Sequence, residues 1–387
     1  MDQFDRLDAF LDRMEVDGYL VDAPATDSDQ RYLSGYDASD PYVTLYTPDR
    51  IAMVIKSLEY PRAKRESRAD AVRRPSDFGY SAYGTPADHR DAVAAFLAEF
   101  DVEAVAVPLR FPAGHADGLR ERGIEVTPED EGVVARVRAI KSDDEIDSIR
   151  EAQRATEAAM RRAEDLIANA AVRDGVLRHE GEPLTAERVK RVLQRDLLDR
   201  GYDLGEPIVA PGEQAADPHE RGSGPLRADE PILIDLAPRD GDSKYHADMT
   251  RTFVRGEPSD EFRERHEVTR EALDAALAAI EPGVTGADVH DAVCDVYEDA
   301  GYATLRSDPD TETGFIHATG HGVGLDGHEL PSVGPGGAEL EPGHAVTIEP
   351  GLYDPAVGGV RIEDLAVVTE DGHENLTEYP IELELGE

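Results

Sequence analysis

Apolar residues recur at helical spacing in some blocks of this chain and as short strand-like runs in others. The two kinds of block alternate up to about residue 128. Helical spacing predicts helices at 4–14, 87–100 and 114–122, and short apolar runs predict strands beginning at 18 and spanning 43–46, 51–55 and 102–107. This alternation predicts a smaller N-terminal α/β domain over residues 1–128, with a mixed or parallel sheet. The segment Arg31–Tyr36 fits neither period, and both an aromatic-flanked loop over a site and a plain turn remain open for it.

From residue 129 onward, longer helical patterns alternate with paired strands. Ser142 and Glu145 form a capping box for a helix that extends to about residue 171. Similar patterns predict helices at 184–200, 259–280 and 285–300, one β-ribbon at 231–254 and further strands from 315 onward. The order helix, helix, ribbon, helix, helix, ribbon predicts a second domain, residues 129–387, of α+β class with two similar halves.

The chain carries 83 acidic and 40 basic residues, a net charge of −43, and few of the basic residues are lysine. The acidic residues are dispersed among periodic apolar positions, which an acidic disordered tail would not produce. We interpret the excess as the surface of a protein from a high-salt cytoplasm, where salt screens the repulsion between like charges. The same charge argues against nucleic acids and anionic membranes as partners.

A single cysteine, Cys294, excludes a disulfide framework and a zinc site made of thiolates. The N-terminal segment predicts an acidic amphipathic helix rather than a signal peptide. No apolar run approaches the roughly 18 residues that a membrane-spanning helix needs. We therefore expect a soluble, cytoplasmic protein.

Two aspartates lie inside the apolar strands of the first ribbon. Asp235 and Asp248 are equally far from a turn centred between Gly241 and Asp242, so they are expected to be cross-strand neighbours. Two carboxylates that face each other on a half-buried ribbon repel and lose hydration. A bound cation would remove both costs, and this placement therefore points to a metal site.

The second set of strands repeats this arrangement. Glu349 and Glu363 are equally far from Ala356, so they too are expected to face each other. His317, His321 and His328 lie between the two ribbons, among glycines that favour an extended strand edge over a helix. Four carboxylates with one imidazole form a hard, oxygen-rich donor set that suits Mn²⁺ or Co²⁺, and their charge can balance two divalent ions.

These residues closely resemble the metallopeptidases of the pita-bread fold, in the branch that contains prolidase (Xaa-Pro dipeptidase) and aminopeptidase P. The resemblance covers roughly residues 129–370, with a weaker likeness at Arg31–Tyr36. The matching motifs are Ile234-Asp-Leu236, Ala247-Asp-Met-Thr-Arg-Thr252, His321-Gly-Val-Gly-Leu-Asp-Gly-His-Glu329, Thr347-Ile-Glu-Pro-Gly351 and Gly359-Val-Arg-Ile-Glu-Asp364.

The resemblance implies the roles of nine residues. Two divalent metal ions, Mn²⁺ first with Co²⁺ or Zn²⁺ as alternatives, would be held by Asp235, Asp248, His321, Glu349 and Glu363. A hydroxide that bridges the ions would attack the Xaa-Pro bond, with Glu349 as general base. The residues His219, His317, His328 and Arg361 would contact substrate or orient the carboxylates. A small peptide substrate and a homodimer are also implied.

Some features depart from this family. The turn between Asp235 and Asp248 is about two residues longer than usual, and Ser332 replaces an arginine that binds the substrate carboxylate in some prolidases. Dipeptides and longer peptides therefore both remain open as substrates. Two alternatives remain: a relative that cleaves a C–N bond in a small non-peptide compound, and a non-catalytic binding module of the same fold.

Overall fold

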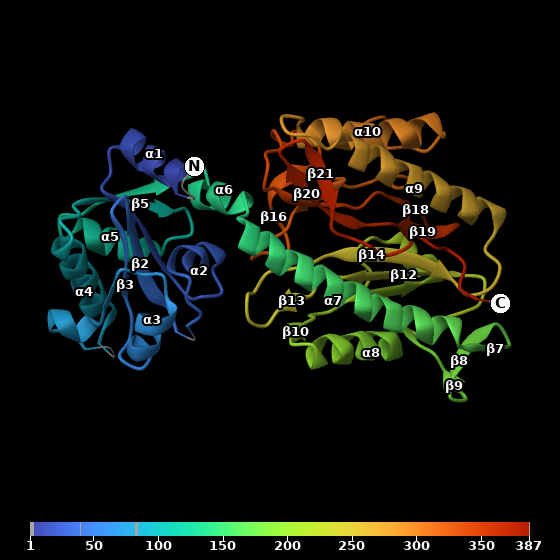
Figure 1. Cartoon of the computed structure of the whole chain (residues 1–387), viewed down its shortest axis with the longest axis horizontal. Helices are drawn as coiled ribbons and strands as arrows, with labels where there is room; N and C mark the ends of the chain where they lie inside the picture. The colour runs from blue at the N-terminus through green and yellow to red at the C-terminus, as the bar shows by residue number, and fades with distance from the viewer. Residues whose placement is uncertain (1–3, 39, 82–83, 387) are drawn as a thin grey trace. The chain divides into compact units, whose positions relative to one another are not determined.

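The computed structural model describes residues 4–38, 40–81 and 84–386 (Figure 1). The chain divides into two compact units, residues 1–138 and 139–387. The boundary expected from the sequence, 128/129, lies ten residues earlier. Two side-chain contacts hold the intervening segment to the first unit: Tyr19 donates to Glu129 over 2.8 Å, and Arg138 donates to Asp29 over 3.0 Å.

The first unit is built on a mixed six-stranded sheet, in agreement with the sequence prediction. Its strand order is β4-β3-β2-β1-β5-β6, in which β2 is antiparallel to β1 and β3, and the pairs β3-β4, β1-β5 and β5-β6 are parallel. The strands are β1 Gly18–Ala23, β2 Tyr42–Thr47, β3 Arg50–Val54, β4 Ala71–Arg73, β5 Ala104–Pro108 and β6 Glu125–Glu129. Parallel pairing brings the carboxyl ends of β1 and β5 to the same edge of the sheet.

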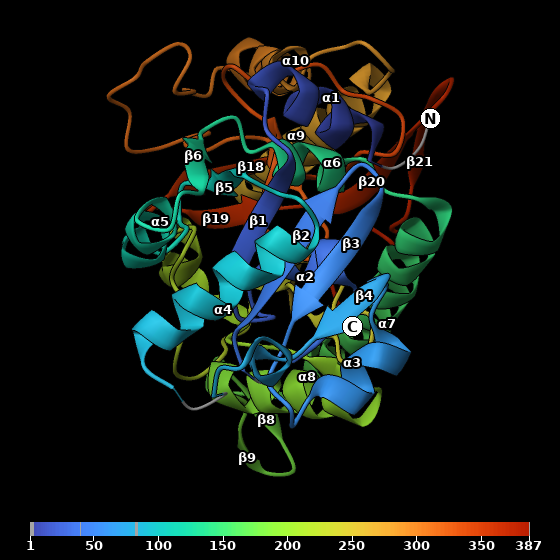
Figure 2. The same cartoon turned by 90° about the vertical axis from the view of Figure 1, so that its left-hand side faces the viewer.

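Helices cover this sheet, with α4 in front of it in Figure 2. They are α1 Asp5–Met14, α2 Ser28–Ser34, α3 Tyr60–Glu66, α4 Pro86–Glu99, α5 Ala113–Arg120 and α6 Val133–Ala139, with a 3₁₀ turn at Pro75–Phe78. The interpretation of Arg31–Tyr36 as a loop or plain turn was wrong, because most of it belongs to α2. Asp27 caps this helix through the amide of Gln30, and Gly35 ends it with a φ of 62°.

The second unit contains the four long helices that the sequence predicts. They are α7 Asp143–Ala168, α8 Ala186–Asp199, α9 Asp260–Ala279 and α10 Gly286–Asp299. Each begins after a hydroxyl side chain at the N-cap: Ser142, Thr185, Ser259 and Thr285. The capping box expected at Ser142 and Glu145 is present.

The strands of this unit form two main layers between the helices (Figure 1). The first sheet has the order β11-β12-β14, and the second has the order β16-β15-β17-β20-β21, with a β18-β19 ribbon beside it. Their bounds are β11 Ile208–Pro211, β12 Pro231–Leu236, β14 Met249–Val254, β15 Gly320–Gly322, β16 Glu329–Val333, β17 Ala345–Ile348, β18 Gly351–Asp354, β19 Gly358–Arg361, β20 Asp364–Thr369 and β21 Gly372–Asn375. Smaller elements are β7 Ala171–Arg173, β8 Val176–His179, β9 Glu182–Pro183, β10 Tyr202–Asp203, β13 Arg239–Asp240 and a 3₁₀ turn at Gly212–Ala216.

Each helix pair shares a core with one ribbon. Residues of α7 and α8 are buried with those of β12 and β14, and residues of α9 and α10 are buried with those of β17 and β20. This arrangement confirms the predicted α+β class and the two helix-pair and ribbon halves. Because the carboxylates emerge from the ribbons, both halves contribute to the site.

The register of the first ribbon corrects the sequence prediction. Asp235 pairs with Thr250 and Leu236 with Met249, so Asp248 does not lie directly opposite Asp235. The turn is centred one residue later than expected, since the amide of Asp240 donates to the carbonyl of Tyr245. The two aspartates are instead diagonal neighbours on one face.

The second ribbon has the predicted register. Ile348 pairs with Asp364 in the β17-β20 ladder, and Gly351 pairs with Arg361 in the β18-β19 ladder. Both ladders have the same centre, Ala356, and they place Glu349 opposite Glu363 in the gap between them. The backbone amides of the two glutamates bond to other strands: that of Glu349 donates to the carbonyl of Thr319, and that of Glu363 donates to the carbonyl of Thr250.

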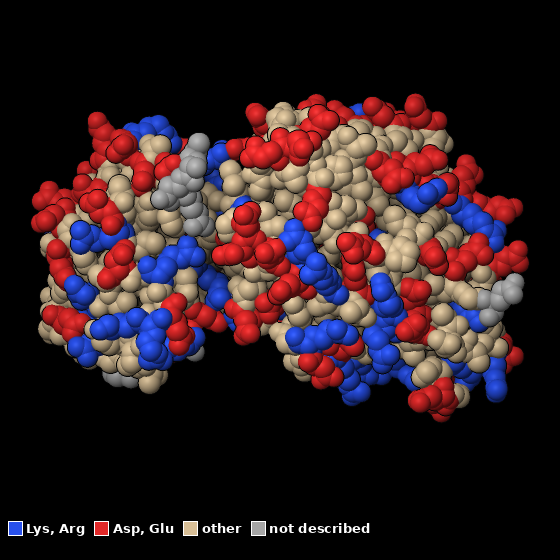
Figure 3. Space-filling view, viewed as in Figure 1, with Lys and Arg blue, Asp and Glu red and all other residues tan. Residues whose placement is uncertain are grey.

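Acidic side chains are scattered over the visible face of each unit and do not gather in one segment (Figure 3). This distribution agrees with the dispersed acidic pattern of the sequence and its net charge of −43. Among the described helices, none combines the length and apolar character needed to cross a membrane.

Candidate functional site

All nine residues that the sequence singled out line one cavity of the second unit. Its volume is about 620 Å³. The nine are Asp235, Asp248, His321, Glu349, Glu363, His219, His317, His328 and Arg361. Further lining residues include Ile208, Arg221, Ile316 and Ser332, which add apolar walls and a second guanidinium. Segments more than a hundred residues apart in the sequence thus converge on one hollow.

The five predicted metal ligands come from both ribbons and from the strand β15 between them. Asp235 lies in β12 and Asp248 directly precedes β14, whereas Glu349 and Glu363 occupy the gap in the second ribbon. Asp248, His321 and Glu363 present ligand atoms that all lie within 4.8 Å of one another. The Nε2 atom of His321 is 3.4 Å from a Glu349 oxygen and 3.9 Å from an Asp248 oxygen.

Burial makes this collection of carboxylates electrostatically unfavourable by itself. Asp248 is 5% exposed and Glu363 is 2% exposed. Burial, together with the neighbouring carboxylates, raises the pKa of both groups well above the ordinary value. Burial also raises the pKa of Glu349 to about 7, with Arg361 opposing and Asp235 adding to the shift. Charges that the protein itself leaves uncompensated are the signature of a site built for cations.

The two ring nitrogens of His321 have different surroundings. Its Nδ1–H donates to the carbonyl of Gly322 over 3.1 Å, which leaves the Nε2 lone pair facing the carboxylates. Burial lowers the pKa of His321 to about 4, so the ring is neutral near pH 7. The ring of His328 stacks beside it at a centroid distance of 3.8 Å. His321 is therefore in the protonation state that a metal ligand requires.

Arg361 connects three groups at the floor of the cavity. Its guanidinium donates to Asp235 over 2.6 Å, to the hydroxyl of Tyr353 over 2.9 Å and to Thr250 over 3.3 Å. Thr250 in turn donates to Glu363 over 2.7 Å. The arginine side chain is 4% exposed and fully engaged, so it orients Asp235 rather than projecting free into the cavity.

The other two predicted histidines differ in their freedom. His317 donates from Nδ1 to the carbonyl of Ala318 over 2.7 Å, and its Nε2 accepts from Tyr353 over 3.0 Å. Both nitrogens of His317 are thus engaged within the protein. His219 lines the cavity from an exposed position in the loop before β12. His219 is therefore the more accessible of the two to a ligand.

The sequence prediction did not include three residues that hold the site together. Tyr353 links Arg361 to His317, Thr250 supports Glu363, and Thr347 donates to Glu349 over 3.3 Å. Thr250 and Thr347 each lie two residues from a predicted ligand, on the ribbon strands, and this spacing was the signal available. Tyr353 carries no such signal, because its contacts depend on how β18 folds back on β19.

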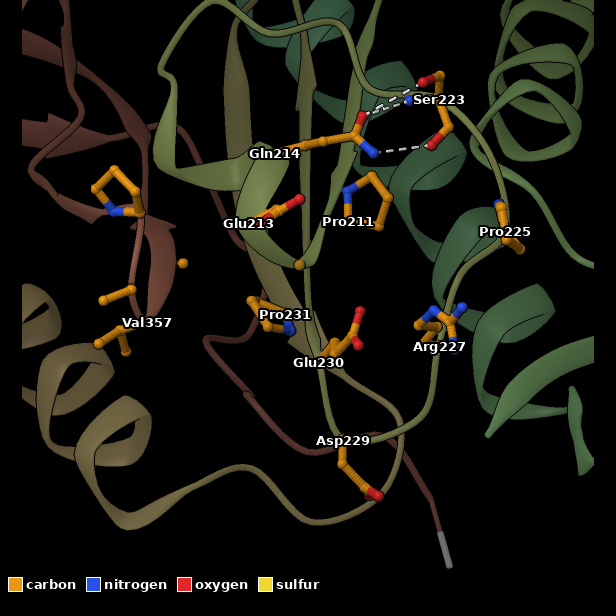
Figure 4. Close-up of a pocket in the computed structure, with 14 residues that line it drawn as sticks. Pro211, Glu213, Gln214, Ser223, Pro225, Arg227, Asp229, Glu230, Pro231 and Val357 are labelled. Atoms are coloured by element: carbon orange, nitrogen blue, oxygen red, sulfur yellow. Dashed lines mark hydrogen bonds between the residues drawn. The ribbon is translucent and has the colours of Figure 1, made fainter. Parts of the chain in front are cut away.

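A second hollow of about 500 Å³ lies on another part of the unit (Figure 4). Its lining includes Glu213, Asp229, Glu230 and Arg227, and Gln214 and Ser223 hydrogen-bond to each other across one side. The residues that line it include none of the nine predicted site residues and no histidine. We therefore assign the chemistry to the first cavity.

Comparison with known families agrees with this assignment. Residues 147–370 match the family described as metallopeptidase family M24. Residues 3–140 match the family described as the creatinase/prolidase N-terminal domain. The chain belongs to metallopeptidase family M24. This membership confirms the resemblance inferred from the ribbon motifs, and the M24 match spans all nine site residues.

Individual relatives extend over nearly the whole chain. The chain is 33% identical to a probable dipeptidase PepE of Mycobacterium bovis over 86% of this chain and 82% of that protein. It is 27% identical to an Xaa-Pro dipeptidase of Pyrococcus horikoshii over 97% of this chain and 96% of the relative. A solved Xaa-Pro dipeptidase from Bacillus anthracis superimposes with a TM-score of 0.83 at 26% identity, over 99% of each chain.

Membership of a metallopeptidase family implies divalent metal ions, and the donor set fits them. Asp248, Glu363 and His321 present ligand atoms within 4.8 Å of one another, and burial with neighbouring carboxylates raises the pKa of both acidic groups. Carboxylates with one imidazole prefer hard or borderline ions such as Mn²⁺, Co²⁺ and Zn²⁺. The cavity is therefore the candidate metal centre of this M24 chain.

Proposed function

We propose that this chain hydrolyses the bond between an N-terminal residue and proline, using two divalent ions held by Asp235, Asp248, His321, Glu349 and Glu363. The observation that carries the proposal is the convergence of these five donors on one cavity of about 620 Å³. A hollow of this size suits a small peptide. The relatives described as Xaa-Pro dipeptidases supply the substrate class.

The side chains of the site would have separate roles in the reaction. Metal ions in this site would supply Lewis acidity that polarises a peptide carbonyl and lowers the pKa of water. Glu349 would accept the proton of the attacking water as general base, and Thr347 donates to its carboxylate over 3.3 Å. Arg361 fixes the orientation of Asp235 through their 2.6 Å contact.

Histidines would stabilise the substrate on the open side of the cavity. We assign His328 and His219 to hydrogen bonding with the scissile carbonyl, since both line the cavity and donors there stabilise developing negative charge. His317 has both nitrogens engaged, so a contact with substrate requires it to release Tyr353. In this proposal Tyr353 and Arg361 are positioning residues.

The proposal is tested by metal-dependent hydrolysis of Ala-Pro. We expect activity to disappear in chelator and to return with Mn²⁺. The active protein should carry about two metal ions per chain, and Asp248→Ala should lose activity. Asp242→Ala, an exposed aspartate of the same ribbon, is the matched control and should retain activity. Activity that persists in chelator would refute the metal hydrolase.

A comparison of Ala-Pro with a longer Xaa-Pro peptide tests which length of substrate the protein cleaves. Ser332 lines the cavity and supplies no charge to bind a dipeptide's carboxylate, whereas Arg221 does lie in the lining. Turnover of Ala-Pro alone would indicate a dipeptidase, and turnover of a longer Xaa-Pro peptide an aminopeptidase. Hydrolysis of neither, with metal bound, would favour the small non-peptide C–N substrate. Absence of bound metal would favour the non-catalytic module.

We also propose Mn²⁺ as the working ion, a homodimer as the active form, and the cytoplasm of a high-salt cell as its location. The oxygen-rich donor set supports the ion, and the net charge of −43 supports the salt adaptation. Reactivation by a series of metals tests the ion. Sedimentation at low and high salt tests the oligomeric state and the salt dependence of the fold.

A further inference from the structure

A second group of metal-ligating side chains lies in the first unit. Asp22, His89 and His115 present ligand atoms that all lie within 4.8 Å of one another. His89 donates from Nε2 to Asp22 Oδ2 over 2.8 Å, and His115 donates from Nδ1 to the same oxygen over 2.7 Å. The two rings are 4.9 Å apart between centroids. Both imidazoles are thus directed at one carboxylate oxygen.

The fold brings these side chains together from three elements. Asp22 is the fifth residue of β1, His89 lies in the first turn of α4, and His115 lies in the first turn of α5. The chain enters β5 from α4 and leaves it into α5, so the beginnings of both helices lie at the edge where β5 ends. In α/β sheets this edge is where ligands bind. The helices α4 and α5 also pack against each other.

Burial and access differ among the three residues in a way that suits an ion. The Asp22 side chain is 8% exposed, whereas those of His89 and His115 are 34% and 27% exposed. Burial would raise the pKa of Asp22, but the hydrogen bonds from His115 and His89 outweigh it and lower the pKa below the ordinary value. A buried anion thus lies beneath two imidazoles that solvent can reach.

One carboxylate oxygen and two imidazole nitrogens, held on three separate elements, are thus close enough together to act as ligands of one ion. We propose that Asp22, His89 and His115 bind one divalent transition-metal ion through Oδ2, Nε2 and Nδ1. On binding, the proton between each ring nitrogen and Asp22 moves to the other nitrogen of a neutral ring, or to solvent from a protonated ring, so the two hydrogen bonds to Asp22 are exchanged for three metal–ligand bonds.

The donor set predicts which ion enters. Two imidazoles and one carboxylate favour Zn²⁺ over Mn²⁺, in contrast to the oxygen-rich cavity of the second unit. Three protein ligands leave a position open for water on the side where the histidines are exposed. The ion would tie β1, α4 and α5 together and stabilise the first unit. None of these residues lines the cavity of the proposed peptidase site, so the inference is independent of that function.

Zinc content measured on the full-length protein tests the proposal. After incubation with Zn²⁺ and desalting, wild type should carry one ion more per chain than His115→Ala, and His373→Ala should match wild type. His373, on β21, is the matched control because it lies outside both metal-ligand clusters. Ions in the proposed peptidase site are common to all three proteins and cancel. With Mn²⁺ the difference should be smaller.

Diffraction at the zinc edge supplies a test that needs no variant. An anomalous peak bonded to Asp22 Oδ2, His89 Nε2 and His115 Nδ1 would establish the site. No peak there at millimolar Zn²⁺, or equal zinc content in wild type and His115→Ala, would overturn it and leave a hydrogen-bonded trio. If His115→Ala does not fold, Asp22→Asn preserves shape and removes the anionic ligand, and its zinc affinity should fall by more than the roughly 10–100-fold that loss of an outer-sphere partner costs. Hydrolysis of Ala-Pro should persist in these variants, which separates this result from any failure of the proposed activity.

Discussion

Glu349→Gln should stabilise the metal-free protein near neutral pH. The pKa of Glu349 is raised to about 7 from an ordinary 4.5, chiefly by burial. The difference of about 2.5 units corresponds to about 3 kcal/mol, since one pKa unit is worth about 1.36 kcal/mol. The side chain is 20% exposed, so water reduces this value, and we expect about 2–3 kcal/mol. Glutamine keeps the shape of the protonated acid and carries no charge to desolvate.

The sign of the effect depends on pH. A carboxyl group whose pKa is higher in the folded state binds its proton more tightly there, so it stabilises the protein at low pH, and this contribution is lost as pH rises from 4.5 to about 7. In chelator, Glu349→Gln and wild type should be nearly equal at pH 4.5, and the variant should be more stable at pH 7.5. Urea unfolding followed by circular dichroism measures both free energies. Glu370→Gln, an exposed glutamate of the same unit, is the control and should show no such pH-dependent gain.

Added metal should reverse the result. With Mn²⁺ present, Glu349 would act as a ligand, and ligand binding to the folded state stabilises wild type more than the variant. A variant that is no more stable than wild type at pH 7.5 in chelator would refute the electrostatic reasoning. So would a difference that stays the same at both pH values.

Three further predictions concern the support of the site and the core. Lys141→Met should cost about 3–5 kcal/mol in urea unfolding, because it leaves Glu329 charged and buried after loss of a 2.6 Å contact; the double variant with Glu329→Met should recover most of this. Burial lowers the pKa of His266 to about 4, so the neutral ring adds stability that is lost as pH falls from about 6.5 to 4, and His266→Leu should flatten acid unfolding over that range. Tyr353→Phe should lower kcat for Ala-Pro more than it raises KM, because it releases Arg361 from a 2.9 Å contact; an unchanged kcat would contradict the positioning role.

The fold was predictable where a local pattern determines it. The four long helices of the second unit begin within two residues of their predicted starts, because a hydroxyl side chain before an apolar helical period satisfies the first backbone amides. The helix α2 was missed because its seven residues are too few to show a period, and because its cap, Asp27, was not recognised. The strand β4 was also missed, since its pairing with β3 is non-local and its three residues carry little signal of their own.

The site was predictable from symmetry about the turns, within one residue. This symmetry located Glu349 opposite Glu363 correctly, since the second ribbon is regular on both sides of Ala356. For the first ribbon it predicted Asp248 as the partner of Asp235, whereas the partner is Thr250, two residues later. The error arose because the turn, closed by a β-bridge between Arg239 and His246, is centred one residue later than expected. Tyr353 could not be found this way, since its contacts with Arg361 of β19 and with His317 leave no trace in the spacing of residues along β18.

The two ribbon registers together explain why Arg361 lies beside Asp235. The glutamates face each other directly, whereas Asp235 is diagonal to Asp248 and so is offset along the ribbon. A guanidinium two residues before Glu363 on the same strand face reaches this offset carboxylate and donates to it. Asp235 thus keeps a positive neighbour, whereas burial and the neighbouring carboxylates raise the pKa of Asp248 and Glu363 well above the ordinary value. In the proposed site, Asp235 is therefore paired directly with an arginine of the protein, whereas the more deeply buried carboxylates would be balanced by metal ions.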